Sequence, residues 1–332
     1  MDRFEWIATA AFGLEGVVAR ELARLGLDAK AENGGARFFG TFEDAFRANL
    51  HARCADRILL VMGRFEARSF EELFEGVRAL PWEDFIGERT RFPVNGKCAR
   101  SQLMSVRDCQ SITKKAIVER LRGRYRTDWF VEDAETVSID VALHGDIAQL
   151  TLDASGTALN RRGYRTWNGE APLRETLAAA LVTLSPWRPG MPLHDPMCGT
   201  GTLMIEAAMR MAHRAPGLTR EFAIESWRNM PTEAFGDIRE QARAEFDPSR
   251  IEGISGSDID PEAVELANRH LKQAGLAGRV RFETADMRDC RRAEPQGVFL
   301  CNPPYGERLS DRKACETLYR DMGQMLRANT GW

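Results

Sequence analysis

The segment Asp195–Ala208, with the sequence DPMCGTGTLMIEAA, decides how the second half of the chain is interpreted. A short apolar stretch at 191–195 leads into it, and its two glycines precede an apolar helix expected over 202–213. Glycines at such a strand-to-helix turn let the backbone approach a ligand at the carboxyl end of a parallel sheet. The spacing is not the GxGxxG dinucleotide fingerprint, and a tight turn that serves only helix packing stays an alternative.

Three more apolar stretches follow, and helical patterns separate them. The expected strands are 251–258, 279–284 and 297–302, and the expected helices are 233–245, 261–274 and 312–328. Strands that alternate with helices are typical of a parallel sheet covered by helices. The sequence therefore predicts an α/β domain with a Rossmann-like, doubly wound parallel sheet over 191–332.

The first 155 residues mix strand and helix patterns. Strands are expected near 5–10, 37–39, 57–64, 91–97, 136–143 and 147–153, and helices at 14–25, 42–51, 70–80 and 106–124. Such a mixture indicates an α+β unit over 1–155. A polar connector with the sequence RRGYRTWNGEAPL and a helix that ends near Ser185 occupy 156–190.

The composition excludes several classes of protein. A chain of 332 residues is long enough for two domains, and 43% hydrophobic with 29% charged residues is typical of a globular protein. No apolar run approaches the roughly 18 residues that span a bilayer, and the start, MDRFEW, does not resemble a signal peptide. Seven scattered cysteines without a CxxC pair predict neither disulfides nor a metal site. We therefore expect a cytoplasmic protein without membrane or metal partners.

The net charge of −3 conceals a strongly basic region. Residues 89–126 contain eleven Lys or Arg residues and two acids, so that their net charge is 11 − 2 = +9. This charge attracts a polyanion because salt screens acidic surface that lies more than about 10 Å away. A solvated helix face is the alternative explanation. The candidate nucleic-acid contacts are Lys97, Arg100, Lys114, Lys115, Arg122 and Arg124.

Acidic residues stand at the tips of the second and third strands expected in the rear domain. Asp258 ends the second strand, where a carboxylate in such folds accepts hydrogen bonds from the ribose hydroxyls of a nucleoside cofactor. Asp260 precedes Pro261 and is better explained as a helix cap. Asp286 follows the third strand, and its carboxylate is placed either to accept from an adenine amino group or to cap a loop.

The fourth strand is expected to end in Asn302-Pro303-Pro304-Tyr305. The two prolines stiffen this turn, so that the side-chain oxygen of Asn302 and the carbonyl of Pro303 converge as acceptors. Two such acceptors suit a planar NH2 group, which is a poor nucleophile until it is oriented. Tyr305 offers a ring on which an extruded base stacks. A plain turn is the alternative, and the register with the glycine turn and the two acids argues against it.

In this order, the motifs DPMCGTG, SDID, AD and NPPY resemble those of class I S-adenosylmethionine-dependent methyltransferases that act on exocyclic or amide nitrogens. The longer strings RRGYR, APLRETLAAAL, DPMCGTGTLMIEAA and NPPYGERL narrow the resemblance to the THUMP-domain RNA guanine-N2 methyltransferases, the family of the bacterial 23S ribosomal RNA enzyme RlmL. The opening ATAAFGLEGVVARELARLG is similar to the family's first strand and helix. The resemblance thus covers nearly the whole chain.

The resemblance implies that a ferredoxin-like and THUMP region at 1–155 binds RNA. It also implies that residues 191–332 bind S-adenosylmethionine and methylate guanine N2. The cofactor residues that it implies are Asp195, Gly199 and Gly201 at the methionine end, Asp258 at the ribose, Asp286 at the adenine, and Asn302. The residues implied at the target base are Asn302, Pro303 and Tyr305. The arginines Arg161, Arg162 and Arg165 of RRGYR are expected near the cofactor or an RNA phosphate.

The expected reaction is a direct methyl transfer to guanine N2, and 23S ribosomal RNA is the favoured substrate. Guanine-N2 methylation of tRNA uses the same chemistry and stays open. Further alternatives are a non-catalytic RNA-binding or ribosome assembly factor, adenine-N6 methylation of DNA, and glutamine methylation of a protein. The residues do not predict an oligomeric state.

The family's catalytic domains have a seven-stranded sheet, whereas four strands are expected here before Trp332. We therefore expect the sequence to be a fragment that lacks three C-terminal strands.

Overall fold

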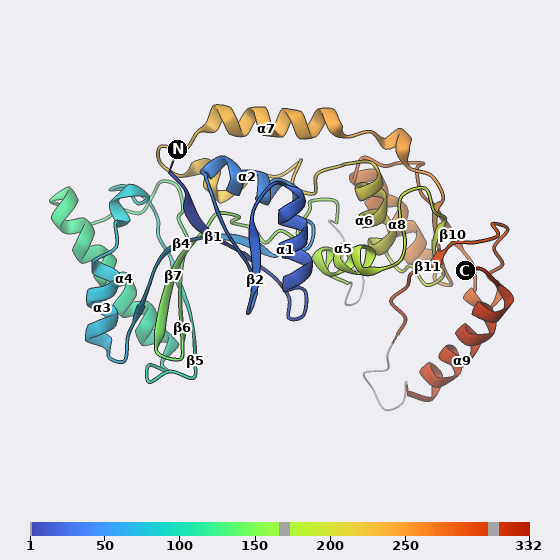
Figure 1. The fold of residues 1–332 in the computed structure, drawn as a ribbon, viewed down its shortest axis with the longest axis horizontal. Helices are drawn as coiled ribbons and strands as arrows, with labels where there is room; N and C mark the ends of the chain where they lie inside the picture. The colour runs from blue at the N-terminus through green and yellow to red at the C-terminus, as the bar shows by residue number, and fades with distance from the viewer. Residues whose placement is uncertain (1, 166–172, 305–311) are drawn as a thin grey trace. The chain divides into compact units, whose positions relative to one another are not determined.

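The computed structural model describes residues 2–165, 173–304 and 312–332. The chain divides into two compact units (Figure 1). The front unit consists of Met1–Leu159 and Glu221–Ile238, and the rear unit consists of Asn160–Arg220 and Arg239–Trp332. Within the described ranges, no helix is long and apolar enough to cross a membrane.

The front unit contains one seven-stranded sheet with the order β2-β3-β1-β4-β7-β6-β5. Its neighbouring strands are antiparallel, apart from the parallel pair β5 and β6. The central strand β4 pairs with β1 on one side and with β7 on the other, so the early and late strands of this unit share one sheet. The strands are β1 (Phe4–Thr9), β2 (Ala29–Glu32), β3 (Gly35–Gly40), β4 (Arg57–Glu66), β5 (Val94–Ala99), β6 (Ile139–His144) and β7 (Ile147–Asp153).

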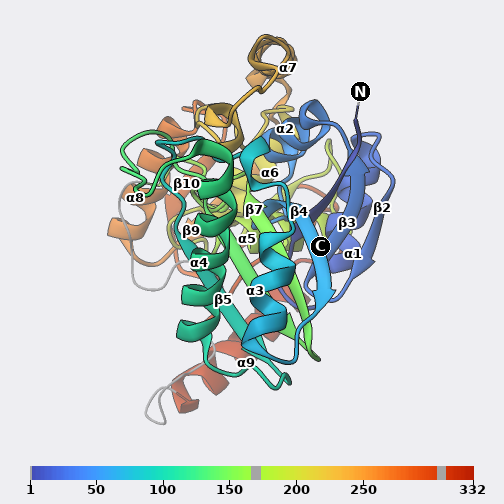
Figure 2. The ribbon, with the colours of Figure 1, turned by 90° about the vertical axis from the view of Figure 1, so that its left-hand side faces the viewer.

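Local capping determines where two of the front helices begin. The hydroxyls of Thr41 and Ser69 accept from the backbone N–H three residues later, and the acids at those positions accept in return. The long helix α4 runs beside α3, as Figure 2 shows, and it also contacts β5 and β6. The helices are α1 (Glu15–Arg24), α2 (Phe42–His51), α3 (Phe70–Arg78) and α4 (Val106–Tyr125).

The rear unit contains a parallel sheet with the order β10-β9-β8-β11, which confirms the predicted fold class. From β8 the chain adds β9 and β10 on one side and then returns to place β11 on the other. Parallel sheets bind ligands beyond the carboxyl ends of the strands where the direction of winding changes, which here is between β8 and β11. The strands are β8 (Leu193–Asp195), β9 (Ile254–Asp258), β10 (Arg281–Thr284) and β11 (Val298–Phe299).

The rear helices follow the expected alternation with the strands. They are α5 (Glu175–Leu184), α6 (Thr202–Met211), α8 (Pro261–Gln273) and α9 (Arg312–Ala328). Helix α7 (Thr232–Glu245) belongs partly to each unit.

Prolines explain why some strands are shorter than expected. The N–H of Leu300 still donates to His194, but the next bond in the ladder between β8 and β11 would need an N–H from Pro196. β11 therefore ends before Asn302. Similarly, β5 begins at Val94, directly after Pro93. The prediction missed β2 because its sequence, AKAE, is poor in strand-forming residues.

The glycine turn before α6 is tightly packed at Gly201. This residue has a left-handed φ of +81°, and an added Cβ would lie 2.9 Å from Phe282 and 3.0 Å from Ala267. The helix that it begins is almost wholly buried. Gly201 therefore serves the packing role that the sequence left as an alternative.

We expect Gly201→Ala to destabilise the rear unit by about 2–4 kcal/mol, because it combines left-handed strain with overpacking. Urea unfolding followed by circular dichroism measures this change. Gly236→Ala on α7 is the matched control, since Gly236 is exposed and an added Cβ meets no heavy atom within 4 Å. The control should be neutral or stabilise by up to about 1 kcal/mol. Equal stability of the two variants would contradict the packing role.

Candidate functional site

A pocket of about 500 Å³ opens at the carboxyl ends of the rear strands. Five of the residues singled out from the sequence line it, and they come from four separate segments of the chain, one at the end of each rear strand. The distant segments are brought together because the strands are parallel and adjacent. These five residues are Gly199, Asp258, Asp286, Asn302 and Pro303.

Gly199 and Asp258 form the contact between β8 and β9 at the pocket. The backbone N–H of Gly199 donates to one carboxylate oxygen of Asp258 at 2.7 Å, and that of Asp260 donates to the other at 3.0 Å. An added Cβ on Gly199 would meet no heavy atom within 4 Å, so this glycine faces open space. Asp260 caps α8 by accepting from the N–H of Glu262, as predicted.

The structure confirms the capping role of Asp286, and its predicted contact with an adenine amino group stays a prediction. Its carboxylate accepts from the backbone N–H of Arg288 at 2.9 Å and from the guanidinium of the same residue. The backbone hydrogen bond lowers the pKa of Asp286, and the ion pair lowers it further. Arg288 also pairs with Asp321 on α9, which joins this wall of the pocket to the last helix. Asp286 therefore caps a turn and lines the pocket as an anion.

The diproline corner forms another wall of the pocket. Asn302 is exposed and lines the pocket with Pro303. The carbonyl of Pro304 accepts from the hydroxyl of Tyr319 on α9 at 2.9 Å, which holds the corner. Tyr305 lies outside the described residues. Burial raises the pKa of the neighbouring Cys301 thiol to about 12, with a further contribution from Asp195, so this sulfur remains protonated at neutral pH.

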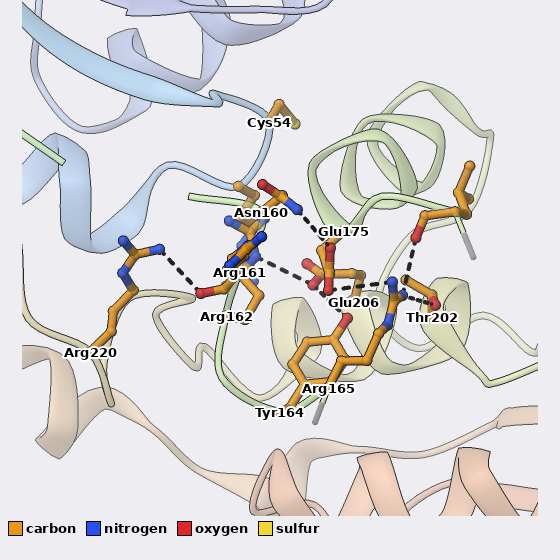
Figure 3. Close-up of polar contacts among 12 residues, drawn as sticks. Cys54, Asn160, Arg161, Arg162, Tyr164, Arg165, Glu175, Thr202, Glu206 and Arg220 are labelled. Atoms are coloured by element: carbon orange, nitrogen blue, oxygen red, sulfur yellow. Dashed lines mark hydrogen bonds and ion pairs between the residues drawn. The ribbon is translucent and has the colours of Figure 1, made fainter. Parts of the chain in front are cut away.

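Arg162 and Arg165 lie in a buried ionic cluster, which the sequence did not predict (Figure 3). Arg162 and the hydroxyl of Tyr164 both donate to Glu206 of α6, at 3.5 Å and 3.1 Å. Arg165 donates to the hydroxyl of Thr202 and pairs with Glu175 of α5. The expectation that these arginines reach cofactor or RNA phosphate is wrong for Arg162, whose side chain is 1% exposed. The cluster instead attaches the connector to α5 and α6.

The predicted nucleic-acid contacts fall into two groups. Lys114 donates to the carbonyl of Phe92 and to Glu132, and its ammonium lies 3.4 Å from the centre of the Phe92 ring. Arg122 pairs with Glu119 and Asp128. The exposed group, which forms no ion pair within the described ranges, consists of Lys97, Arg100, Lys115 and Arg124.

Comparisons with known proteins identify the domains. Residues 5–59 match the RlmL ferredoxin-like domain, 67–153 match the THUMP domain, and 162–332 match the RMKL-like methyltransferase domain. The putative RNA methyltransferase YpsC of Bacillus subtilis is 42% identical over 100% of this chain and 87% of its own. The chain belongs to the RMKL-like methyltransferases.

Other relatives of this RMKL-like methyltransferase carry more specific names. The ribosomal RNA large subunit methyltransferase K/L of Syntrophotalea carbinolica is 36% identical over 99% of this chain and 48% of its own. SMU.472, a putative methyltransferase solved with SAH, is 40% identical, with a TM-score of 0.95 over 100% of this chain and 88% of its own. A predicted N6-adenine-specific DNA methylase from Listeria monocytogenes is 44% identical, with a TM-score of 0.96 over the same shares.

Asp195 is the last residue of β8, directly before the pocket residues Pro196 and Met197, and it is 2% exposed. Burial raises its pKa to about 8, and the negative charge of Asp258 contributes, while a hydrogen bond from the N–H of Met197 opposes the change. In the unfolded chain the same carboxyl ionises near pH 4. Between these pH values Asp195 carries a proton in the folded protein but not in the unfolded chain. The contribution of Asp195 to the stability therefore falls as the pH rises.

We therefore expect the contribution of Asp195 to the free energy of unfolding to decrease between pH 5 and pH 8, by at most about 1.4 kcal/mol per pH unit. Asp195→Asn should remove this contribution because the amide does not titrate. Urea unfolding of both proteins at several pH values compares the slopes. Equal slopes would show that Asp195 is already ionised in the folded protein at pH 5.

Proposed function

We propose that this methyltransferase transfers a methyl group from S-adenosylmethionine to the exocyclic N2 of a guanine in RNA, with 23S ribosomal RNA as the favoured substrate. The observation that carries the proposal is that one pocket is lined both by Gly199 and Asp258 and by Asn302 and Pro303. The first pair suits a nucleoside cofactor, and the second suits a planar amine.

The pocket residues fit S-adenosylmethionine. The carboxylate of Asp258 accepts one backbone bond on each oxygen and keeps acceptor capacity for ribose hydroxyls. Gly199 leaves open space for close approach, and Asp286 lines the same pocket as an acceptor. The SAH complex of SMU.472, at 40% identity, supports the same assignment. When bound, S-adenosylmethionine supplies an electrophilic methyl group.

Asn302 and Pro303 would orient the target amine. Two fixed acceptors align both N–H bonds and stabilise the positive charge that develops on nitrogen. No covalent bond between enzyme and base is needed, and the neighbouring Cys301 is a poor nucleophile because its thiol is protonated. We propose a direct transfer on these grounds, with Tyr305 stacking on the base.

The THUMP match and the exposed cations of the front unit support RNA as the substrate. The K/L name of a relative at 36% identity favours ribosomal RNA. The same pocket would serve a guanine in tRNA equally well. Mapping N2-methylguanine in 23S ribosomal RNA and tRNA from cells that lack the gene separates these substrates, and loss from neither would contradict the proposal.

We expect Asn302→Ala to reduce methyl transfer by at least about 100-fold, because one of the two acceptors is lost. Its affinity for S-adenosylmethionine, measured by calorimetry, should change by no more than a few fold. The matched variant Asp258→Ala should show the opposite pattern, with the larger loss in cofactor affinity. Equal loss of both properties in Asn302→Ala would count against its role in orienting the base.

We expect removal of the exposed cations to weaken RNA binding more than removal of a paired one. The double change Lys97→Ala with Arg100→Ala should lower the affinity and reduce the slope of log K against log salt by about 1–2. Arg122→Ala should reduce the slope less, because Glu119 and Asp128 already offset its charge. Fluorescence anisotropy at several salt concentrations measures both quantities. A larger effect of Arg122→Ala would place the RNA elsewhere.

A further inference from the structure

A second pocket, of about 340 Å³, lies wholly within the front unit. Its walls are mainly apolar and aromatic, with Phe42, Phe85 and Met62 among them, and Asp84, Arg228 and Asn229 add polar groups. The Phe42 and Phe85 rings meet edge to face, with their centres 6.3 Å apart. Apolar walls with a few polar groups are typical of sites for small molecules or parts of larger ligands of that size.

Two irregularities of the backbone shape this pocket. The register between β4 and β7 shifts between Val61 and Gly63, so that Met62 occupies a bulge and lines the pocket. Asn229 has a left-handed φ of +58°. Bulges and left-handed non-glycine residues are concentrated at ligand sites. Their coincidence here indicates a formed site rather than a packing defect.

A hydrogen-bond chain connects the pocket to the basic helix α4. The guanidinium of Arg228 donates to the hydroxyl of Tyr125, the last residue of α4, at 2.8 Å. That hydroxyl donates in turn to the carbonyl of Ile86 at 2.8 Å. Arg124 and Arg126 flank Tyr125 and are exposed. The end of α4 that carries these two cations is therefore hydrogen-bonded to a residue that lines the pocket.

We propose that this pocket receives one unstacked nucleobase of a single-stranded RNA segment, while the arginines at the end of α4 hold its phosphates. Bases in an RNA duplex are stacked and inaccessible, whereas single-stranded bases stack on aromatic rings and guanidinium groups. Phe42 and Arg228 provide such surfaces, the buried Phe85 adds to the apolar wall, and Asp84 and Asn229 provide acceptors and donors for the base edge. The inference rests on the proposed RNA substrate and adds a second contact to it.

The experiment measures binding of a fluorescein-labelled RNA dodecamer of mixed sequence by anisotropy. Met62→Trp fills the pocket and should weaken binding about tenfold, which corresponds to the loss of one stacked base. Arg228→Ala, at an exposed position, should weaken binding by a similar factor without loss of core packing. Arg24→Ala, at an exposed position on α1, is the control for charge and should stay within twofold.

Crosslinking locates the base directly. A dodecamer that contains 4-thiouridine should crosslink to peptides that contain Met62, Phe85 or Arg228. Wild-type affinity in both Met62→Trp and Arg228→Ala, or crosslinks only to other peptides, would overturn the inference. Displacement of the RNA by micromolar AMP or GMP would also overturn it, because a free nucleotide would then be the ligand.

Methyl transfer to RNA, measured on the same preparations, separates the two proposals. If the wild type methylates RNA while the pocket variants bind it normally, the inference about the pocket fails alone. If the dodecamer crosslinks in the pocket but no methyl group reaches ribosomal RNA or tRNA, the proposed function fails alone.

Discussion

The rear pocket depends on the two hydrogen bonds that the carboxylate of Asp258 accepts. Its two oxygens hold the backbone N–H groups of Gly199 and Asp260, so one side chain joins the glycine turn after β8 to the start of α8. The pocket geometry therefore does not rely on the strands alone, which are short. At the other end of the glycine turn, the hydroxyl of Thr202, the first residue of α6, accepts a hydrogen bond from Arg165. The glycine turn that lines the rear pocket is thus held at both of its ends.

The two units differ in whether their charged side chains are buried or exposed. The rear unit buries arginines with carboxylates, where the ion pair compensates for lost hydration only because both partners are present. Of the six predicted RNA contacts in the front unit, four are exposed without an ion pair among the described residues, while Lys114 and Arg122 are paired with acids. The net charge of +9 counted over residues 89–126 therefore overstates the electrostatic field that a polyanion would meet. The four exposed cations still provide a positive field near the surface.

Local signals predicted most elements of the fold, and contacts distant in sequence account for most of the differences. The bounds of α2 and α9 agree with the prediction, and a capping box marks the start of α2. The placement of Gly199, Asp258, Asp286 and Asn302 around one pocket followed from their positions after parallel strands. By contrast, the partners of Arg162 and Lys114 lie 44 and 18 residues away, and no local pattern predicts such pairs. Sequence also could not tell that Gly199 faces space while Gly201 is packed.

The buried pair of Arg162 and Glu206 limits how this chain can diverge. Removal of one member of a buried ion pair leaves a charge without its counterion and costs about 3–5 kcal/mol, a large share of the stability of a typical domain. Replacement of both by apolar residues of similar volume is often tolerated. The two positions should therefore change together among descendants of this sequence. Covariation between positions 162 and 206 among related sequences would show that the buried ion pair is kept or replaced as a unit.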